Sequence, residues 1–586
     1  MIREDAAMHA SRRVSLVLAA VTTFALPTVA HSQQAAIYSS LDRFHPVIAQ
    51  NGMVASQEAT ATEVGVDILR RGGNAVDAAV AVGFTLAVTL PRAGNIGGGG
   101  FMLVHLAGSG ETVAIDYRER APAASDRDMY LDAEGNADPE LSRFTQLAVG
   151  VPGTVAGLAL AHERYGSGTF TLAELMQPAI DLAENGIPVT GGLANSLADL
   201  RDRLTRWPTS AAIFYRPDGS DFDVGDTLVQ ADLAQSLRQI AEQGPAAFYD
   251  GPIGEAIVAE LAQGNGIMTL DDLRAYEAVV REPVTGDYRG YRIASMPPPS
   301  SGGIHIVQIL NILEDVPVAD LGHNSAQTIH WMAEAMKLAY VDRSEYLGDP
   351  DYWEVPMAGL TSQDYADALR AGIDPDHARP AAEIGPGDPA PYESPQTTHF
   401  SVVDADGNAV ANTYTLNFSY GTGLVAGGTG ILLNNELDDF SAKPGVPNAY
   451  GLIGGDANAV APNKRPLSSM SPTFVFDPDG RLFLVTGSPG GSRIITTTLQ
   501  VIMNVIDHGM NIAEATNAVR IHHQWLPDEL RIEEGLSPDT IRLLEGMGHT
   551  VVVRDAMGST QSIMVTDGGF AGASDPRQPD ALTLGY

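Results

Sequence analysis

Residues 397–417 read TTHFSVVDADGNAVANTYTLN, two runs rich in β-branched and aromatic residues on either side of a DADGN turn. This pattern is typical of a β-hairpin. If the turn is centred on Asp406, Thr397 faces Thr415 across the two strands. The register therefore predicts two hydroxyls side by side at the start of the first strand, although threonine is also common in strands for its β-propensity alone.

The segments on both sides of this hairpin predict a mixed architecture. The stretch 372–396 is rich in Pro, Asp and Gly and predicts an exposed loop that ends at Thr397. Helices are expected over 55–90, much of 150–280, 325–347, 493–507 and 512–519, and a long apolar segment of unassigned structure spans 304–313. Further strands are expected at 101–105, 112–117, 474–476, 482–486, 549–555 and 561–566. Strands and helices in both halves predict one sheet sandwich with helical cover, and no linker is long enough to separate domains.

Two short motifs suggest sites on loops. Residues 487–493 read GSPGGSR, between a predicted strand and a predicted helix. Such a turn exposes backbone N–H groups and could form an oxyanion hole, or it could be a plain connection. Residues 464–472 read KRPLSSMSP, which places hydroxyls between prolines. That segment could hold a carboxylate in a rigid loop, or be only a stiff connection.

The composition limits the class of protein. The chain has 586 residues, with 35 Lys+Arg against 72 Asp+Glu, so its formal net charge is −37. This charge argues against nucleic-acid binding and against docking on anionic lipid, and we read it as a solubility trait. The chain has no cysteine, which excludes disulfides, thiolate nucleophiles and cysteine-ligated metal sites.

The N-terminus has the features of a secretory signal peptide. Arg12 and Arg13 precede a largely apolar run from Val14 to Ala30, followed by small residues up to Ser32. We assign residues 1–32 to the signal, with a buried N-terminal helix as the alternative. No later stretch is long and apolar enough for a membrane span. The mature protein is therefore expected in the periplasm or released to the medium.

Several enzyme classes lack their motifs. There is no P-loop, no H-E-x-x-H and no G-x-S-x-G. Residues 421–426 fit a dinucleotide fingerprint, but GGTG follows where a helix should begin, which disfavours that reading. The pair His522-His523 could suggest a metal site, but adjacent residues point apart and no third ligand is evident.

The sequence closely resembles the gamma-glutamyltranspeptidases of the exported bacterial type. The resemblance runs from about residue 45 to the C-terminus and rests on long motifs, which are GGNAVDAAVAVG, GGGGFM, DYRERAP, PPPSSGGIH, PYESPQTTHFSVVD, TYTLN, GILLNNELDDFS, NKRPLSSMSPT and TGSPGGSR. It implies an α+β fold, the N-terminal nucleophile (Ntn) hydrolase four-layer αββα sandwich. It also implies self-cleavage between Gln396 and Thr397. The large subunit would be 33–396 and the small subunit 397–586, and the two would stay together as a heterodimer forming one domain.

The resemblance implies catalytic roles at the hairpin and the glycine turn. Thr397 would be the nucleophile, first for cleavage of its own chain and then for the substrate. Its freed α-amine, which titrates near pH 8, would serve as the base. Thr415 would orient the nucleophile, and Gly490 and Gly491 would form the oxyanion hole.

The resemblance also implies a pocket for a γ-glutamyl group. Arg118 would grip the α-carboxylate, assisted by Ser468 and Ser469. The residues that would hold the α-ammonium are Asn417, Glu436 and Asp439. Residues 441–455 would form a lid with Tyr450 as its gate. The alternative for Arg118 taken alone is a surface ion pair with Glu119.

The expected activity is transfer of the γ-glutamyl group of glutathione and related compounds to water, amino acids or dipeptides. We expect no cofactor, no metal, no nucleic-acid partner and no membrane partner. One rival is a β-lactam (glutaryl or cephalosporin) acylase of the same fold, whose substrate side chain lacks the α-ammonium and α-carboxylate. Another is an inactive homologue that acts as an exported binding protein, which an intact Thr397 and Thr415 disfavour.

Overall fold

The computed structural model describes residues 42–387, 398–447 and 451–586. Residues Arg43–Tyr586 form one compact unit. The expected signal peptide, the cleavage pair Gln396 and Thr397, and the lid residue Tyr450 lie outside the described residues.

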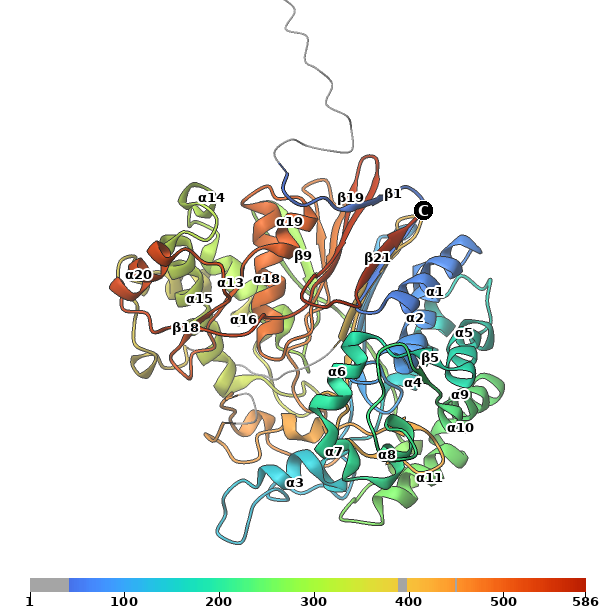
Figure 1. Cartoon of the computed structure of the whole chain (residues 1–586). Helices are drawn as coiled ribbons and strands as arrows, with labels where there is room; N and C mark the ends of the chain where they lie inside the picture. Colours follow the sequence, from blue (N-terminus) through green and yellow to red (C-terminus); the bar gives the residue numbers. More distant parts are fainter. Residues whose placement is uncertain (1–41, 388–397, 448–450) are drawn as a thin grey trace, which may run out of the picture. The chain divides into compact units, whose positions relative to one another are not determined.

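Two seven-stranded antiparallel sheets form the centre of the unit Arg43–Tyr586 within the described residues (Figure 1). The first has the order β1 (Val47–Ala49), β20 (Gly569–Ser574), β19 (Gln561–Thr566), β15 (Leu482–Thr486), β14 (Thr473–Phe476), β9 (Tyr291–Ser295) and β8 (Val284–Tyr288). The second has the order β21 (Leu582–Gly585), β2 (Met53–Ser56), β10 (Thr398–Val403), β11 (Ala409–Thr415), β3 (Gly99–Leu106), β4 (Glu111–Tyr117) and β7 (Val279–Arg281).

Helices cover the outer face of each sheet, so the unit has four layers (Figure 1). One hydrophobic cluster lies between the sheets and includes Phe101, Ala411 and Phe474. The second sheet packs its other face on α1 (Ala59–Arg70), α2 (Ala75–Thr89) and α4 (Thr154–Tyr165), while α5 (Leu172–Asn185) packs on α2 and α9 (Ala231–Gln243) packs on α5. The first sheet packs on α13 (Gly302–Leu313), α18 (Arg493–Ile506) and α19 (Ile512–Asn517), and α15 (Ala326–Tyr346) packs on α13. The predicted αββα sandwich is confirmed.

Shorter elements complete the described chain. The remaining α-helices are α3 (Pro139–Phe144), α6 (Gly191–Asp199), α7 (Arg201–Thr205), α8 (Pro208–Phe214), α10 (Ala246–Tyr249), α11 (Pro252–Leu261), α12 (Leu270–Arg274), α14 (Val318–Leu321), α16 (Met357–Leu360), α17 (Gln363–Arg370) and α20 (Pro538–Gly546). The remaining strands are β5 (Ile187–Pro188), β6 (Thr227–Leu228), β12 (Val425–Ala426), β13 (Ile431–Leu432), β16 (Ile521–His522), β17 (Leu530–Ile532) and β18 (Val551–Val553).

Helix α2 illustrates why the sequence forms these layers. Each of its residues is buried, so it lacks the polar face of a surface helix. Asn74 and Asp77 form a capping box at its start, and Pro91 follows shortly after its end. The helix packs on both α1 and the central hairpin, which fixes the strands that lead to the site.

The predicted hairpin register holds for each pair that the structure describes. Strands β10 and β11 pair antiparallel from Thr398 opposite Tyr414 to Val403 opposite Ala409. The neighbours of this hairpin are β2 and β3, so it lies inside the sheet. One prediction was wrong, because residues 55 and 56, expected to be helical, belong to β2.

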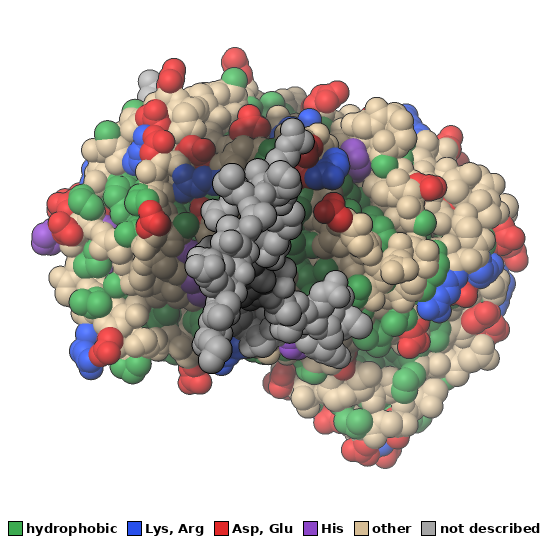
Figure 2. All heavy atoms as spheres, turned by 90° about the horizontal axis from the view of Figure 1, so that it is seen from above, with side chains coloured by type: hydrophobic (Ala, Val, Ile, Leu, Met, Phe, Trp, Pro, Cys, Tyr) green, Lys and Arg blue, Asp and Glu red, His purple; other side chains and the backbone are tan. Residues whose placement is uncertain are grey.

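The surface agrees with the acidic composition. Figure 2 shows Asp and Glu side chains spread over one face, with Lys and Arg side chains between them. The acids do not gather into a single patch on the visible face, as expected for a charge that serves solubility.

Candidate active site

The end of β4 supplies an arginine at the centre of a buried charge cluster. Arg118 follows β4 directly and its side chain is fully buried. Its guanidinium forms ion pairs with Glu436 and Asp439, both in the 3-10 helix η3 (Glu436–Asp439). Its Nη1 also lies 3.7 Å from Oε2 of Glu119. One cation therefore faces three buried carboxyl groups.

The loop that carries Ser468 and Ser469 is hydrogen-bonded to Arg118. Arg118 Nε donates to the carbonyl oxygen of Pro466 at 3.1 Å, and Nη2 donates to that of Leu467 at 3.3 Å. Ser468 and Ser469 come next in the chain and are buried. Arg343 of α15 donates to the hydroxyl of Ser469 at 2.5 Å. Ser468 and Ser469 therefore directly follow the two residues whose carbonyl oxygens accept hydrogen bonds from Arg118.

Burial and mutual repulsion shift the pKa values of the cluster. Burial raises the pKa of Glu119 to about 7, even though Arg118 acts in the opposite direction. Burial also raises the pKa of Glu436 well above its ordinary value, and the nearby Glu119 adds to this effect. For Arg118, burial acts to lower the pKa, but the surrounding carboxylates outweigh it and the pKa is raised. The arginine is charged, while the acids compete for protons.

Three carboxyl oxygens of the cluster have no hydrogen-bond donor among the described residues apart from a proton held between Glu119 and Glu436. These atoms are both oxygens of Glu119 and Oε2 of Glu436. A buried acceptor without a donor costs free energy, so such atoms need an explanation. An ammonium group that entered the cluster would supply donors to these oxygens in place of the shared proton.

Replacing Glu119 by Gln is expected to make the fold less sensitive to pH. Because the pKa of Glu119 is higher in the folded chain than its usual 4.5, its protonation stabilises the fold below pH 4.5. That contribution is lost as the pH rises through about 7, and it amounts to up to about 3 kcal/mol. Thermal denaturation at pH 5 and pH 8 should show Glu119→Gln gaining stability over the wild type at pH 8. Equal differences at the two pH values, or the same gain in the exposed Glu163→Gln, would contradict this assignment.

Glu119 is the site residue that sequence reasoning missed. The alternative of a surface ion pair with Arg118 is wrong, because both side chains are fully buried. The motif DYRERAP contains Glu119 and was the available signal. Its meaning depended on partners in η3, more than 300 positions further along the chain, which local spacing does not reveal.

The end of β11 supplies Thr415 and Asn417. Thr415 is buried and pairs with Gly99 of β3. Its hydroxyl accepts a hydrogen bond of 2.8 Å from the backbone N–H of Asn417. Asn417 has a φ of 69°, an uncommon value for a residue other than glycine, and its amide donates to the carbonyl oxygen of Asn435 at 3.0 Å. These contacts tie the hairpin to the residue preceding η3.

The first residue of β10 is Thr398, and Gln396 and Thr397 lie outside the described residues. Thr398 donates its hydroxyl hydrogen to Oε1 of Gln57 at 2.5 Å. His399 is fully buried, and burial lowers its pKa to about 3, so it is neutral. The predicted pair of Thr397 and Thr415 remains a prediction.

The turn after β15 presents two glycine N–H groups. Gly490 has a φ of 136° and Gly491 a φ of 69°, values that favour glycine over other residues. Neither N–H donates a hydrogen bond within the described part of the chain. The turn leads into α18, whose N-terminus adds positive potential. The arrangement suits an oxyanion, and the oxyanion role of Gly490 and Gly491 stays a prediction.

The predicted lid region borders a cavity. Ser441 and Gly454, from the described parts of 441–455, line a space of about 160 Å³ together with Asp439. Asp439 belongs to the charge cluster, so the cavity lies next to it. Tyr450 falls outside the described residues.

One group of side chains elsewhere has the composition of a metal site. Ligand atoms of His330, Glu334 and His549 lie within 4.8 Å of one another. However, Nδ1 of His330 and Nε2 of His549 are hydrogen-bonded at 2.9 Å, and Lys337 already pairs with Glu334 at 2.8 Å. The ammonium group of Lys337 thus occupies the position beside the Glu334 carboxylate that a metal ion would need. The residues of the charge cluster take no part in this group.

The histidine pair considered from the sequence does not form a shared site. His522 is hydrogen-bonded to Thr496, while His523 lies 3.3 Å from a carboxylate oxygen of Asp528. In the part of the chain that the structure describes, we find no helix with the length and hydropathy of a membrane span.

Comparison with known proteins assigns the family. The family model described as gamma-glutamyltranspeptidase matches residues 61–584. The chain is 61% identical to the glutathione hydrolase proenzyme of Escherichia coli (strain K12), over 93% of each chain. Its structure is similar to that of cephalosporin acylase from Bacillus halodurans (TM-score 0.82, 30% identity, 94% of this chain and 99% of that chain). It is also similar to a chain of Helicobacter pylori gamma-glutamyltranspeptidase (TM-score 0.56, 44% identity, 59% of this chain and 97% of that chain). With its charge cluster, its central hairpin and its glycine turn, the chain belongs to the gamma-glutamyltranspeptidase family.

Proposed function

We propose that this protein is a self-processing gamma-glutamyltransferase and glutathione hydrolase. The observation that carries the proposal is the buried cluster of one arginine and three carboxyl groups, which the described residues leave with more acceptor oxygens than donors. A γ-glutamyl group ends in an α-carboxylate and an α-ammonium. It therefore needs one cationic and one anionic partner at the same place, which this cluster provides.

Binding would be an exchange of ion partners. The substrate carboxylate would take the place of a protein carboxylate on Arg118, assisted by the hydroxyls of Ser468 and Ser469. The released carboxyl groups of Glu436 and Asp439, together with Asn417, would accept the ammonium. The exchange adds one cation and one anion, so the net charge of the cluster does not change.

The proposed reaction passes through an ester on Thr397. The hydroxyl oxygen of Thr397 attacks the γ-carbonyl carbon while its α-amine takes the hydroxyl proton. The N–H groups of Gly490 and Gly491 stabilise the oxyanion. The carbon–nitrogen bond then breaks, and the leaving amine receives that proton. Water or the amine of an acceptor opens the ester in the second half of the reaction, and Thr415 orients the nucleophile in both halves.

The same residue would mature the precursor. We propose that cleavage between Gln396 and Thr397 yields a large subunit of residues 33–396 and a small subunit of 397–586, after removal of residues 1–32 on export to the periplasm or the medium. The relatives named as proenzymes support this. Cleavage is required before the α-amine of Thr397 exists.

The described chain ahead of the cleavage site is anchored to α15. Asp342 accepts hydrogen bonds from the N–H of Gly387 at 2.7 Å, the hydroxyl of Tyr365 at 2.6 Å and the amide of Gln308 at 2.7 Å. Tyr346 donates its hydroxyl hydrogen to the carbonyl oxygen of Gly387 at 3.0 Å. Burial raises the pKa of Asp342 to about 6, so these contacts are made by a carboxylate at neutral pH.

Asp342→Asn is therefore expected to slow maturation. The side-chain NH₂ group of the new asparagine would face a group that is itself a donor, so at least one of the three hydrogen bonds would be lost. A hydrogen bond to a charged group contributes about 1.5–3 kcal/mol, and we therefore expect cleavage to be about tenfold slower. Gel electrophoresis of freshly made protein over time measures the rate. Wild-type kinetics in the variant would contradict this role. Asp364→Asn, at an exposed position of α17, is the control.

The proposed activity is separated from its nearest rival by a pair of substrates. The likeness to a cephalosporin acylase keeps an acylase as the second candidate. We expect hydrolysis of γ-glutamyl-p-nitroanilide and a much lower rate with glutaryl-p-nitroanilide, which lacks the α-ammonium and α-carboxylate. A preference for the glutaryl compound would favour the acylase. Residues 441–455, with Tyr450 as the gate, would act as a lid that favours small γ-glutamyl compounds.

A further inference from the structure

A second cavity touches the glycine turn but not the charge cluster. It measures about 200 Å³, and the residues that matter here are Gln57, Arg92, Ser419, Gly490, Gly558 and Gln578. Its volume suits a small organic molecule, since one water takes about 30 Å³ in the liquid. None of the proposed γ-glutamyl-binding residues lines it.

Two contacts place this cavity beside the reaction centre. Gly490, a proposed oxyanion donor, belongs to its wall. Gln57, on the same wall, accepts the hydroxyl hydrogen of Thr398, the residue after the proposed nucleophile. A group bound in this cavity would therefore lie near the γ-carbonyl, away from the residues that hold the glutamyl end.

Arg92 brings an unused positive charge to the cavity. Its side chain is half-buried, and within the described residues its guanidinium makes no hydrogen bond and no ion pair. Burial lowers the pKa of Arg92, while Tyr420 and Asp580 act in the opposite direction. Asp580 is hydrogen-bonded to Thr190 at 3.0 Å instead. An unpaired guanidinium is notable in a chain with 72 acidic residues.

The cavity also has a second donor without an acceptor. Nε2 of Gln578 is buried and forms no hydrogen bond among the described residues. The side chain of Gln578 is only 9% exposed. Among the described residues, neither this amide nor the guanidinium of Arg92 has a hydrogen-bond acceptor. A buried donor without an acceptor costs free energy, and an anionic ligand would remove that cost.

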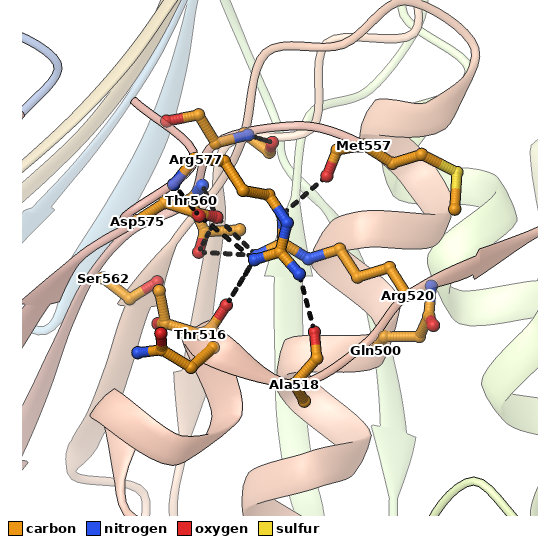
Figure 3. A network of polar contacts seen from close by, with 12 residues as sticks. Gln500, Thr516, Ala518, Arg520, Met557, Thr560, Ser562, Asp575 and Arg577 are labelled. Atoms are coloured by element: carbon orange, nitrogen blue, oxygen red, sulfur yellow. Dashed lines mark hydrogen bonds and ion pairs between the residues drawn. The ribbon is translucent and has the colours of Figure 1, made fainter. Parts of the chain in front are cut away.

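A saturated ionic network fixes the wall that carries Gln578. Figure 3 shows Arg520 and Arg577 converging on Asp575, just after β20. Arg577 also pairs with Glu533 and donates to the carbonyl oxygens of Thr516 and Ala518. Arg577 also lines the cavity, but its donors are engaged by these partners. The guanidinium of Arg92 is therefore the positive group that can bind an anion in the cavity. The same network holds the turn that carries Gln578.

We propose that this cavity binds the free carboxylate of the amine half of the reaction through Arg92, with Gln578 as the second donor. Its ligands are amino acids and dipeptides, both as the leaving group of the first step and as the acceptor of the second. The inference rests on the proposed function and adds the place and the charge requirement of acceptor binding. Acceptors whose carboxylate is blocked as an amide should bind poorly.

The test compares two acceptors in transfer from γ-glutamyl-p-nitroanilide. Glycylglycine carries a carboxylate, whereas glycylglycinamide presents the same amine without that charge. We expect the wild type to prefer glycylglycine in kcat/KM by about 10- to 100-fold, the range for a hydrogen bond to a charged group. In Arg92→Gln the preference should fall to near unity, and in Arg92→Lys it should be partly retained. Transfer is normalised to each variant's own hydrolysis of the donor, and the two-fragment pattern on a gel verifies maturation.

The outcomes separate this inference from the proposed function. The carboxylate site is overturned if the preference for glycylglycine persists in Arg92→Gln, or if the wild type shows no such preference. In both cases, hydrolysis of the donor by the wild type still supports the proposed function. Lack of donor hydrolysis by the mature wild type overturns both. Arg542→Gln, at an exposed position of α20, is the matched control and should retain the wild-type preference.

Discussion

Thr397→Ala is expected to remain a single uncleaved chain without activity on γ-glutamyl-p-nitroanilide. The methyl group cannot attack the carbonyl of Gln396, so neither the new N-terminus nor its α-amine forms. The chain lacks cysteine and the motifs of the other common nucleophiles, so no second nucleophile is expected to replace it. The loss should approach the full rate enhancement of the enzyme, beyond a thousandfold.

The measurement is gel electrophoresis together with the anilide assay on the same preparation. Thr397→Ser keeps a hydroxyl and is the matched control, expected to be cleaved and active at a reduced rate. An uncleaved Thr397→Ala chain with the thermal stability of the precursor locates the effect in chemistry rather than in folding. A cleaved and active Thr397→Ala protein would show that another residue is the nucleophile.

Arg118→Lys is expected to lose about 100-fold in kcat/KM for γ-glutamyl substrates, mainly through KM. The planar guanidinium serves two carboxylates and two backbone carbonyls at once. A lysine ammonium keeps the charge but cannot reproduce that fork. Since the buried carboxyl groups would lose part of their compensation, the fold should also lose stability, by about 3–5 kcal/mol at most.

The control for this variant is Arg120→Lys. Arg120 belongs to the same motif but donates to the carbonyl oxygens of Asn463 and Ala275, outside the cluster. Steady-state kinetics and thermal denaturation of both variants separate the loss of binding from the loss of stability. An Arg118→Lys enzyme with an unchanged KM would show that another residue binds the carboxylate.

Local patterns predicted the central elements because these are specified locally. The β10–β11 hairpin combines an Asp-Gly turn with β-branched strands, and its register follows from the turn. Helix α2 has a capping box and a following proline. The strands that the sequence did not indicate have other causes. Strand β2 is buried along its whole length, so it lacks alternation, and in β20 (GFAGAS) every residue except Phe570 is Gly, Ala or Ser, which do not favour strands.

The candidate site was predicted in pieces, and the structure supplies their relation. Resemblance of separate motifs suggested Arg118 and, more than 300 positions further along the chain, Glu436 and Asp439; the structure brings them into one cluster. The burial of Glu119, and the place of Arg92 in a cavity wall without an ion pair among the described residues, depend on segments far away in sequence. Spacing within a motif carries no information on such contacts.

The most direct test of the central claim is N-terminal sequencing of the smaller fragment from freshly purified active enzyme. The account predicts that this fragment begins TTHFSVV, so that the nucleophile and its base belong to one chain end. A fragment that begins at any other residue, or full activity in a chain that has not been cleaved, would contradict it.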